Sequence, residues 1–272
     1  MSKGSSRFKD ALQNVFAASA ILIAFVVSYL LFVNIMGNPV NFEGGNPKGL
    51  ALEGNYLGII YKGGFIVPIL MTCVLALIIF VFERIITLSR AKGKGRLNTF
   101  VRTLQNLLNE DKIEEAMDAC DKQKGSLANG MKAGLLRYRD LQLDKELEKD
   151  QKILSIQKSF EEATALELPM LSRNMVIFST LASISVLIGL IGTVLGMIRA
   201  FAALAQSGAP DALALSQGIS EALVNTAFGI TGSTLAIIAF NYFSTSVDSY
   251  TYKIDEAGFS LTQNFATSLK ST

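Results

Sequence analysis

The sequence contains no histidine and no tryptophan, and it has only two cysteines and five prolines among its 272 residues. Cys73 lies in an apolar run and Cys120 in a charged region, so their spacing indicates neither a disulfide nor a metal site. The usual Cys/His nucleophiles and His/Cys metal ligands are excluded by composition. The net charge of +2 is small, and no basic stretch alternates with aromatic residues as in nucleic-acid-binding surfaces. We therefore expect no enzyme, cofactor, metal or nucleic-acid partner.

What the chain does have is long apolar runs. Half of its residues are hydrophobic, and the mean hydropathy is +0.38. A membrane-spanning helix needs about 20 apolar residues. Four runs without a charged residue reach that length, namely residues 15–36, 63–82, 175–198 and 222–247. The first is longer than the apolar part of a secretory signal peptide, which indicates an uncleaved helix. The sequence predicts an all-α membrane protein with four transmembrane helices in the lipid bilayer.

Charge asymmetry predicts the orientation of these helices. Basic residues follow the second run closely, against the single acid Glu83; they are Arg84, Arg90, Lys92, Lys94, Arg96 and Arg102. The N-terminal segment is also basic, with Lys3, Arg7 and Lys9. Because cytoplasmic flanks are enriched in lysine and arginine, we expect both termini in the cytoplasm.

Periodicity predicts what lies between the spans. Apolar residues recur at helical spacing in residues 97–108, 113–121 and 127–166, which indicates a helical cytoplasmic module. A Gly- and Asn-rich stretch at 37–62 indicates an external loop. The predicted organisation is a first helix with its external loop (1–62), a transmembrane helix (63–82), the cytoplasmic module (83–174), a transmembrane hairpin (175–247) and a cytoplasmic helical tail (248–272).

The hairpin carries small and polar residues at helical spacing. Such residues let two helices approach closely in a bilayer. The glycines expected to pack there are Gly189, Gly192, Gly196, Gly229 and Gly232. Thr193, Asn225 and Thr226 lie in the same hairpin, and Glu221 adds a carboxylate near the membrane, which costs about 2.5–3.5 kcal/mol unless it is paired or hydrated. The residues alone allow a hydrated lining, or threonines bonded to their own helix and an interfacial glutamate near a helix N-terminus.

Two segments of the hairpin resemble a known family. Residues 188–196, IGLIGTVLG, and residues 218–229, GISEALVNTAFG, are similar to the signature helices of the MotA/TolQ/ExbB family, with most similarity to its ExbB and TolQ branch. The resemblance implies a ring of identical subunits, usually five, in the bacterial inner membrane. The ring would surround an ExbD/TolR-like single-span partner with a membrane aspartate. Such a complex works with a TonB/TolA-like energy transducer and couples proton flow to outer-membrane transport or envelope maintenance.

The resemblance also implies roles for individual residues. Thr193 and Thr226 match the family's two threonines, which would face the partner's carboxylate in a proton pathway. Glu221 matches the acid at the outer start of the last helix, where it would attract cations at the pore mouth or pair with a basic group.

Three features depart from the family pattern. Ser185-Val186 stands where the family commonly has Ala-Pro, and an extra helix precedes the usual spans. Arg199 stands where an uncharged residue is expected, and it would either reach the interface or pair with Glu221.

Two other functions remain open at this point. A self-contained channel or transporter would need intramembrane charges or broken half-helices in repeated halves, and the sequence contains neither. A membrane scaffold would use the small residues for packing alone.

Overall fold

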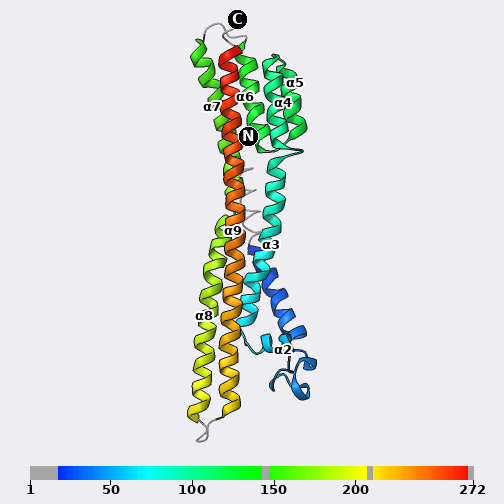
Figure 1. The fold of residues 1–272 in the computed structure, drawn as a ribbon, viewed down its shortest axis with the longest axis vertical. Coiled ribbons are helices and arrows are strands. Elements are labelled where there is room, and N and C mark those ends of the chain that lie inside the picture. The colour runs from blue at the N-terminus through cyan, green and yellow to red at the C-terminus, as the bar shows by residue number, and fades with distance from the viewer. Residues whose placement is uncertain (1–17, 143–146, 207–210, 269–272) are drawn as a thin grey trace. The chain divides into compact units, whose positions relative to one another are not determined.

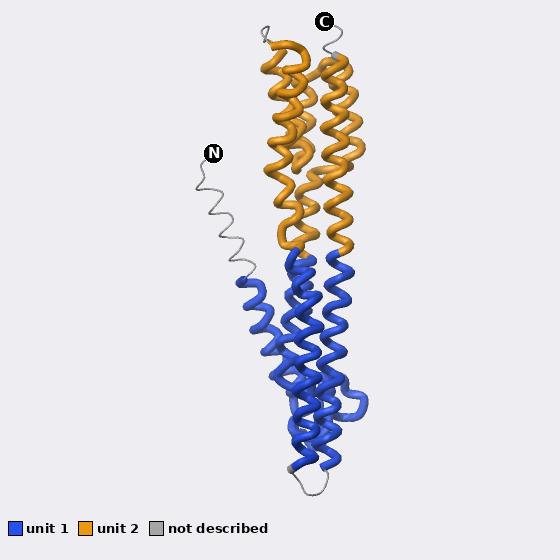
Figure 2. The backbone as a smooth tube through the Cα atoms, turned by 90° about the vertical axis from the view of Figure 1, so that its left-hand side faces the viewer, with its two compact units in different colours: residues 1–81, 176–240 blue, residues 82–175, 241–272 orange. Residues whose placement is uncertain are grey.

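A computed structural model describes residues 18–142, 147–206 and 211–268 (Figure 1). The basic N-terminal residues, part of the predicted link between the last two spans and the last four residues of the tail lie outside these ranges. Within them the chain is helical and contains no β-strand, which confirms the all-α prediction. The chain forms two compact units, residues 1–81 with 176–240 and residues 82–175 with 241–272 (Figure 2). They are called unit 1 and unit 2 below.

Unit 1 contains the apolar helices. Backbone amides in hydrocarbon must bond within the segment, so apolar runs of this length form helices. Four helices are long and apolar enough to cross a membrane, which confirms the four predicted spans. The first is Ala18–Met36, which ends in a π-helical turn, η1 (Phe32–Met36). The others lie in α3 (Ile66–Lys92), α8 (Met175–Gln206) and α9 (Ala212–Ser268).

The predicted external loop is more ordered than its glycine content suggests. It contains two 3₁₀ turns and a short helix: η2 (Pro39–Asn41), η3 (Glu43–Gly45) and α2 (Tyr56–Tyr61). The Asn41 amide donates to the carbonyls of Ile35 and Met36 at 2.7 and 3.0 Å, at the end of the first span. The Asn55 amide donates to Asn41 Oδ1, and its oxygen caps α2. Two asparagines thus satisfy helix ends that would otherwise leave polar groups unpaired.

The extra first helix packs against α3 and α9 in unit 1. Phe32 forms a buried cluster with Val67 and Met71 of α3, and Val224 and Phe228 of α9 pack against that cluster. Residues two positions apart on a helix point in roughly opposite directions. Thr226, midway between Val224 and Phe228, therefore points away from the first helix.

Unit 2 contains a helical module and the end of α9. Its helices are α4 (Leu97–Asn109), α5 (Ile113–Gln123), α6 (Ser126–Gln142) and α7 (Lys149–Ser172). The periodic pattern over 127–166 belongs to two helices, α6 and α7. The second begins at a capping box, in which the Glu148 backbone N–H donates to Gln151 Oε1 at 3.4 Å.

Aromatic residues join α9 to this module. Phe265 of α9 stacks on Tyr138 of α6, with ring centroids 4.1 Å apart. At Gly258 of α9, a Cβ atom would lie 2.2 Å from the Phe160 ring of α7, so only glycine fits there. Cys120 of α5 is also buried, and burial raises the pKa of its thiol to about 12. The thiol is therefore protonated at physiological pH.

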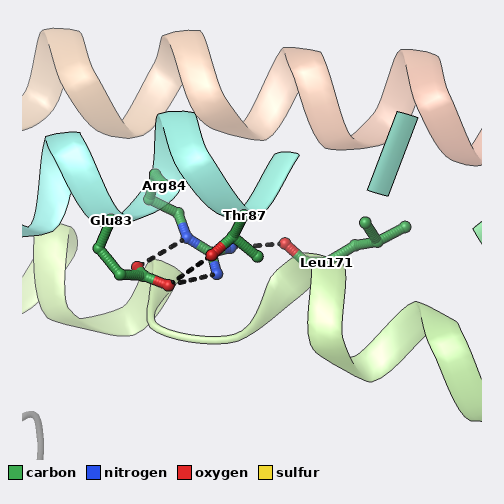
Figure 3. A network of polar contacts seen from close by, with 4 residues as sticks. All are labelled: Glu83, Arg84, Thr87 and Leu171. Atoms are coloured by element: carbon green, nitrogen blue, oxygen red, sulfur yellow. Dashed lines mark hydrogen bonds and ion pairs between the residues drawn. The ribbon is translucent and has the colours of Figure 1, made fainter. Parts of the chain in front are cut away.

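A buried arginine connects α3 to the end of α7. The Arg84 side chain is 1% exposed, and its Nη1 donates to the Leu171 carbonyl at 2.7 Å (Figure 3). Its Nε donates to Glu83 Oε2 at 3.2 Å, while the Thr87 hydroxyl donates to Glu83 Oε1 at 2.8 Å. Leu171 lies in the last turn of α7, where carbonyls have no helical donor. Arg84 thus supplies a charged donor to a helix end.

Candidate functional site

The site is a helix hairpin in unit 1, where α8 and α9 approach closely through glycines. A Cβ atom at Gly229 would lie 2.7 Å from the Ser185 carbonyl oxygen and 2.9 Å from Gly189 Cα. One at Gly196 would lie 2.8 Å from the Ala222 nitrogen. These are backbone atoms, which no side-chain rotation can move. The two helices are therefore in backbone contact along this seam.

The five glycines named from the sequence do not all contact the opposite helix equally. Gly189, Gly196 and Gly229 meet opposing backbone, and Gly192 meets the Asn225 side chain at 2.5–2.8 Å. Gly232 differs, because the nearest atoms to a Cβ there belong to the Ser185 side chain at 3.3 and 3.4 Å. A methyl group at any of the first four would force the opposite helix or the Asn225 side chain to move, whereas at Gly232 the Ser185 side chain would have to give by only a few tenths of an ångström.

The two threonines face each other across this seam. The Thr193 and Thr226 hydroxyls form a hydrogen bond with each other. Thr193 Oγ1 also lies 3.2 Å from the Gly189 carbonyl, and Thr226 Oγ1 lies 3.2 Å from the Ala222 carbonyl. Both side chains are half-buried. A hydroxyl both donates and accepts hydrogen bonds, so each threonine can bond its partner on the opposite helix and still has capacity for a further polar group.

Asn225 adds a buried polar group beside this pair. It is 0% exposed, and its amide nitrogen donates to the Gly63 carbonyl at 2.9 Å, in the turn before α3. Its Oδ1 has no hydrogen-bond partner among the described residues. A buried acceptor without a donor costs about 1–3 kcal/mol. Asn225 therefore joins α9 to the turn that precedes α3 and leaves a strong acceptor next to Thr226.

Glu221 forms an ion pair with Arg199. The carboxylate is on α9 and the guanidinium on α8, with Arg199 Nη1 2.5 Å from Glu221 Oε1. Glu221 is buried, whereas half of the Arg199 side chain is exposed. Gly64 lies against the carboxylate, and its φ of +74° favours glycine. Arg199 was expected either to reach the interface or to pair with Glu221, and the structure shows the pair.

This ion pair predicts a measurable coupling. Arg199→Gln and Glu221→Gln should each lower the free energy of unfolding in detergent. Because Arg199 is half exposed, each loss should be about 1–3 kcal/mol, below the roughly 3–5 kcal/mol of a fully buried pair. The double variant should lose at least about 1 kcal/mol less than the sum of the two single losses, measured by denaturation in a double-mutant cycle. Strictly additive losses would contradict the pairing.

The hairpin contains one further carboxylate, Asp211, which caps a helix. Asp211 Oδ1 accepts hydrogen bonds from the backbone nitrogens of Leu213 and Ala214, both at 3.1 Å, and so caps the start of α9. With Glu221 paired to Arg199, both carboxylates between residues 176 and 240 have protein partners. This hairpin thus offers polar hydroxyls, while its buried carboxylate, Glu221, is paired with Arg199.

Sequence reasoning placed Thr193, Thr226 and Glu221 in the site, and the structure brings the two threonines together while Glu221 lies about one turn before Thr226 on α9. It noted Asn225 as polar but gave it no part in the site. The signal was an asparagine inside a membrane run, where an unpaired amide is costly. Its partner, Gly63, lies 162 residues away, so no local pattern identifies it.

Comparison with known proteins agrees with this geometry. Residues 122–256, about half of the chain, match the model of the MotA/TolQ/ExbB proton channel family. An ExbB-like biopolymer transport protein of Synechocystis is 39% identical over 87 residues, which are 31% of this chain and 41% of that protein. The biopolymer transport protein ExbB of Salmonella typhimurium is 35% identical over 72 residues, 26% of this chain and 30% of that protein.

A longer match extends beyond the hairpin. The Tol-Pal system protein TolQ of Haemophilus influenzae is 23% identical over 204 residues, 74% of this chain and 89% of that protein. The chain spans less than half the length of the two relatives with higher identity. The family region, residues 122–256, contains the paired threonines and the glycine seam. This four-span chain belongs to the MotA/TolQ/ExbB proton channel family.

Proposed function

We propose that this chain is an inner-membrane stator subunit that uses proton flow to drive outer-membrane transport or envelope maintenance. The observation that carries the proposal is the hydroxyl pair of Thr193 and Thr226 in the α8–α9 hairpin. The pair is half-buried in the single chain, so it has an accessible side on which another helix would pack. The names of the relatives, biopolymer transport and Tol-Pal, support this role.

The chain requires a partner to carry the proton. Its apolar runs at 175–198 and 222–247 contain no acid, and Glu221 and Asp211 are both occupied. A carboxylate that gains and loses a proton in the membrane must therefore come from another chain. We propose an ExbD/TolR-like single-span protein with a membrane aspartate, enclosed by a ring of these subunits, usually five, and acting on a TonB/TolA-like transducer.

The energy available is adequate for such a motor. One charge that crosses a membrane gains about 2.3 kcal/mol per 100 mV. A buried carboxylate that is alternately protonated and ionised can use this energy to change its hydrogen-bond partners. In this proposal the threonine pair is the protein surface that the partner's carboxyl group contacts.

The test is the native mass of the complex in mild detergent, with and without a co-expressed single-span partner. The proposal predicts a protein mass of five chains of 29.4 kDa, which increases when the partner is present. A matched control is the same partner with its membrane aspartate changed to leucine, which should bind less because it loses the polar contact. A monomer or dimer that is indifferent to the partner would favour a self-contained transporter or a scaffold.

A further inference from the structure

We propose that a basic cavity in unit 2 binds the phosphate headgroup of an anionic membrane lipid. The cavity has a volume of about 820 Å³ and lies between the end of α3, the start of α4 and the part of α9 after residue 240. Ligand sites typically measure about 300–1,000 Å³. The proposal is independent of the threonine pair, which lies in unit 1.

The lining of the cavity has charge of one sign. Lys92, Arg96 and Lys253 line it, and no carboxylate does. In the described part of the chain none of the three forms an ion pair with an acid. The lining also includes donors suited to phosphate oxygens, among them the Thr245 and Ser249 hydroxyls and the Asn98 and Asn241 amides. Three cations without a counter-ion and several neutral donors match an anion with several oxygens.

The start of α4 adds backbone donors to the same cavity. Arg96 is its N-cap residue, and no side chain caps this end or places an acid in the first turn. The backbone nitrogens of Thr99 and Phe100 bond to the Arg96 carbonyl, but those of Leu97 and Asn98 do not take part in such a turn. A helix N-terminus carries a partial positive charge and free N–H groups, which favour phosphate.

The position of the cavity along the helices favours a lipid over a soluble anion. Phe82, Ile85 and Ile86 of α3 are 62%, 50% and 51% exposed, which is expected where a helix still faces hydrocarbon. At about 1.5 Å per residue, Lys92 lies about 9 Å beyond Ile86, the level of lipid headgroups.

The same argument holds along α9. Tyr242, 67% exposed, lines the cavity within the last part of the apolar run 222–247, and Lys253 lies about 16 Å further along. A phosphate at the cations would therefore leave its acyl chains to follow the exposed apolar residues. Anionic lipids of the cytoplasmic leaflet meet basic juxtamembrane residues in this way.

The test compares lipid retention between two variants with the same change of charge. In the first, Lys92→Gln, Arg96→Gln and Lys253→Gln remove the three cations of the cavity. In the control, Lys94→Gln, Lys122→Gln and Lys158→Gln remove three exposed lysines that do not line it. Each protein is purified from nanodiscs of equal phosphatidylglycerol and phosphatidylcholine, and the co-purified lipid is measured by native mass spectrometry.

The proposal predicts that the wild-type protein and the control retain phosphatidylglycerol over phosphatidylcholine, whereas the cavity variant loses this preference by about tenfold or more. Circular dichroism and gel filtration check that all three proteins fold alike. Equal retention in the two variants would overturn the site, because it would indicate diffuse surface charge. Displacement of the lipid by millimolar inorganic phosphate would overturn the lipid assignment in favour of a soluble anion, whereas retention under that competition supports it.

Discussion

Replacing both Thr193 and Thr226 with valine is expected to lower proton influx by at least about tenfold in liposomes that contain the complex with its single-span partner. Valine has nearly the shape of threonine but cannot donate or accept a hydrogen bond. The hydroxyls bond each other, and both residues are half-buried. A hydrogen bond to a charged group contributes about 1.5–3 kcal/mol, and each 1.4 kcal/mol corresponds to about a tenfold change in rate. Influx is measured with a pH-sensitive dye under an imposed gradient.

The chain supplies a matched control for this substitution. Thr231 and Thr234 lie on α9, as Thr226 does, and both are exposed. Their hydroxyls donate to the carbonyls of Ala227 and Ile230 of the same helix. Thr231→Val with Thr234→Val removes two hydroxyls from α9 without touching the pair, and influx should stay within about twofold of wild type, because neutral surface changes have small effects. If the Thr193/Thr226 variant conducts like this control, the pathway assignment is wrong and a scaffold role gains support.

Replacing Gly229 with alanine is expected to destabilise the protein. The new Cβ would lie 2.7 Å from the Ser185 carbonyl oxygen and 2.9 Å from Gly189 Cα, so the two backbones must separate. Overpacking of this kind costs about 1–3 kcal/mol. We expect a lower midpoint of thermal unfolding, followed by circular dichroism in detergent, and a weaker threonine pair as the helices move apart.

Gly232→Ala is the control for this result. It is the same substitution three residues later on α9, where the nearest atoms are the Ser185 side chain at 3.3 and 3.4 Å. Because alanine favours a helix over glycine by about 1 kcal/mol, this variant should be neutral or slightly stabilised. Equal destabilisation by the two variants would show that the seam does not depend on the close contact at Gly229.

The helices of the membrane region can be predicted from the sequence because each depends on residues close together in the chain. A charge-free apolar run has to form a helix to satisfy its backbone in a bilayer, so the spans are predictable from composition and length. Small residues at intervals of three or four fall on one face, which predicts the seam between α8 and α9. The roles expected of the two threonines follow from the family resemblance, because the residues alone also allow hydroxyls bonded to their own helices.

Other features depend on contacts between distant residues and are not predictable in this way. Arg84 belongs to the basic cluster from which the orientation is predicted, yet it is buried and bonded to Leu171, 87 residues away. The partner of Asn225, Gly63, is equally remote. The basic cavity combines Lys92 and Arg96 with Lys253, which the sequence places in a separate helix. Such sites arise only when helices pack.

The paired Glu221 changes the interpretation of the family's outer acid in this chain. A carboxylate held by Arg199 is less available to attract cations than a free one, because its charge is already compensated. The turn at Gly64 packs against the same carboxylate, so the acid joins three segments of unit 1. In this protein we therefore expect Glu221 to act mainly by holding the outer ends of the hairpin together.

The measurement that tests the stator proposal most directly is proton influx into liposomes that contain the wild-type chain, alone or with its single-span partner. The proposal predicts influx only with the partner, and a loss of influx when the partner's membrane aspartate is changed to asparagine, because this chain has no free acid in the hairpin. Influx through the chain alone, undiminished by the partner variant, would contradict it and indicate a self-contained channel.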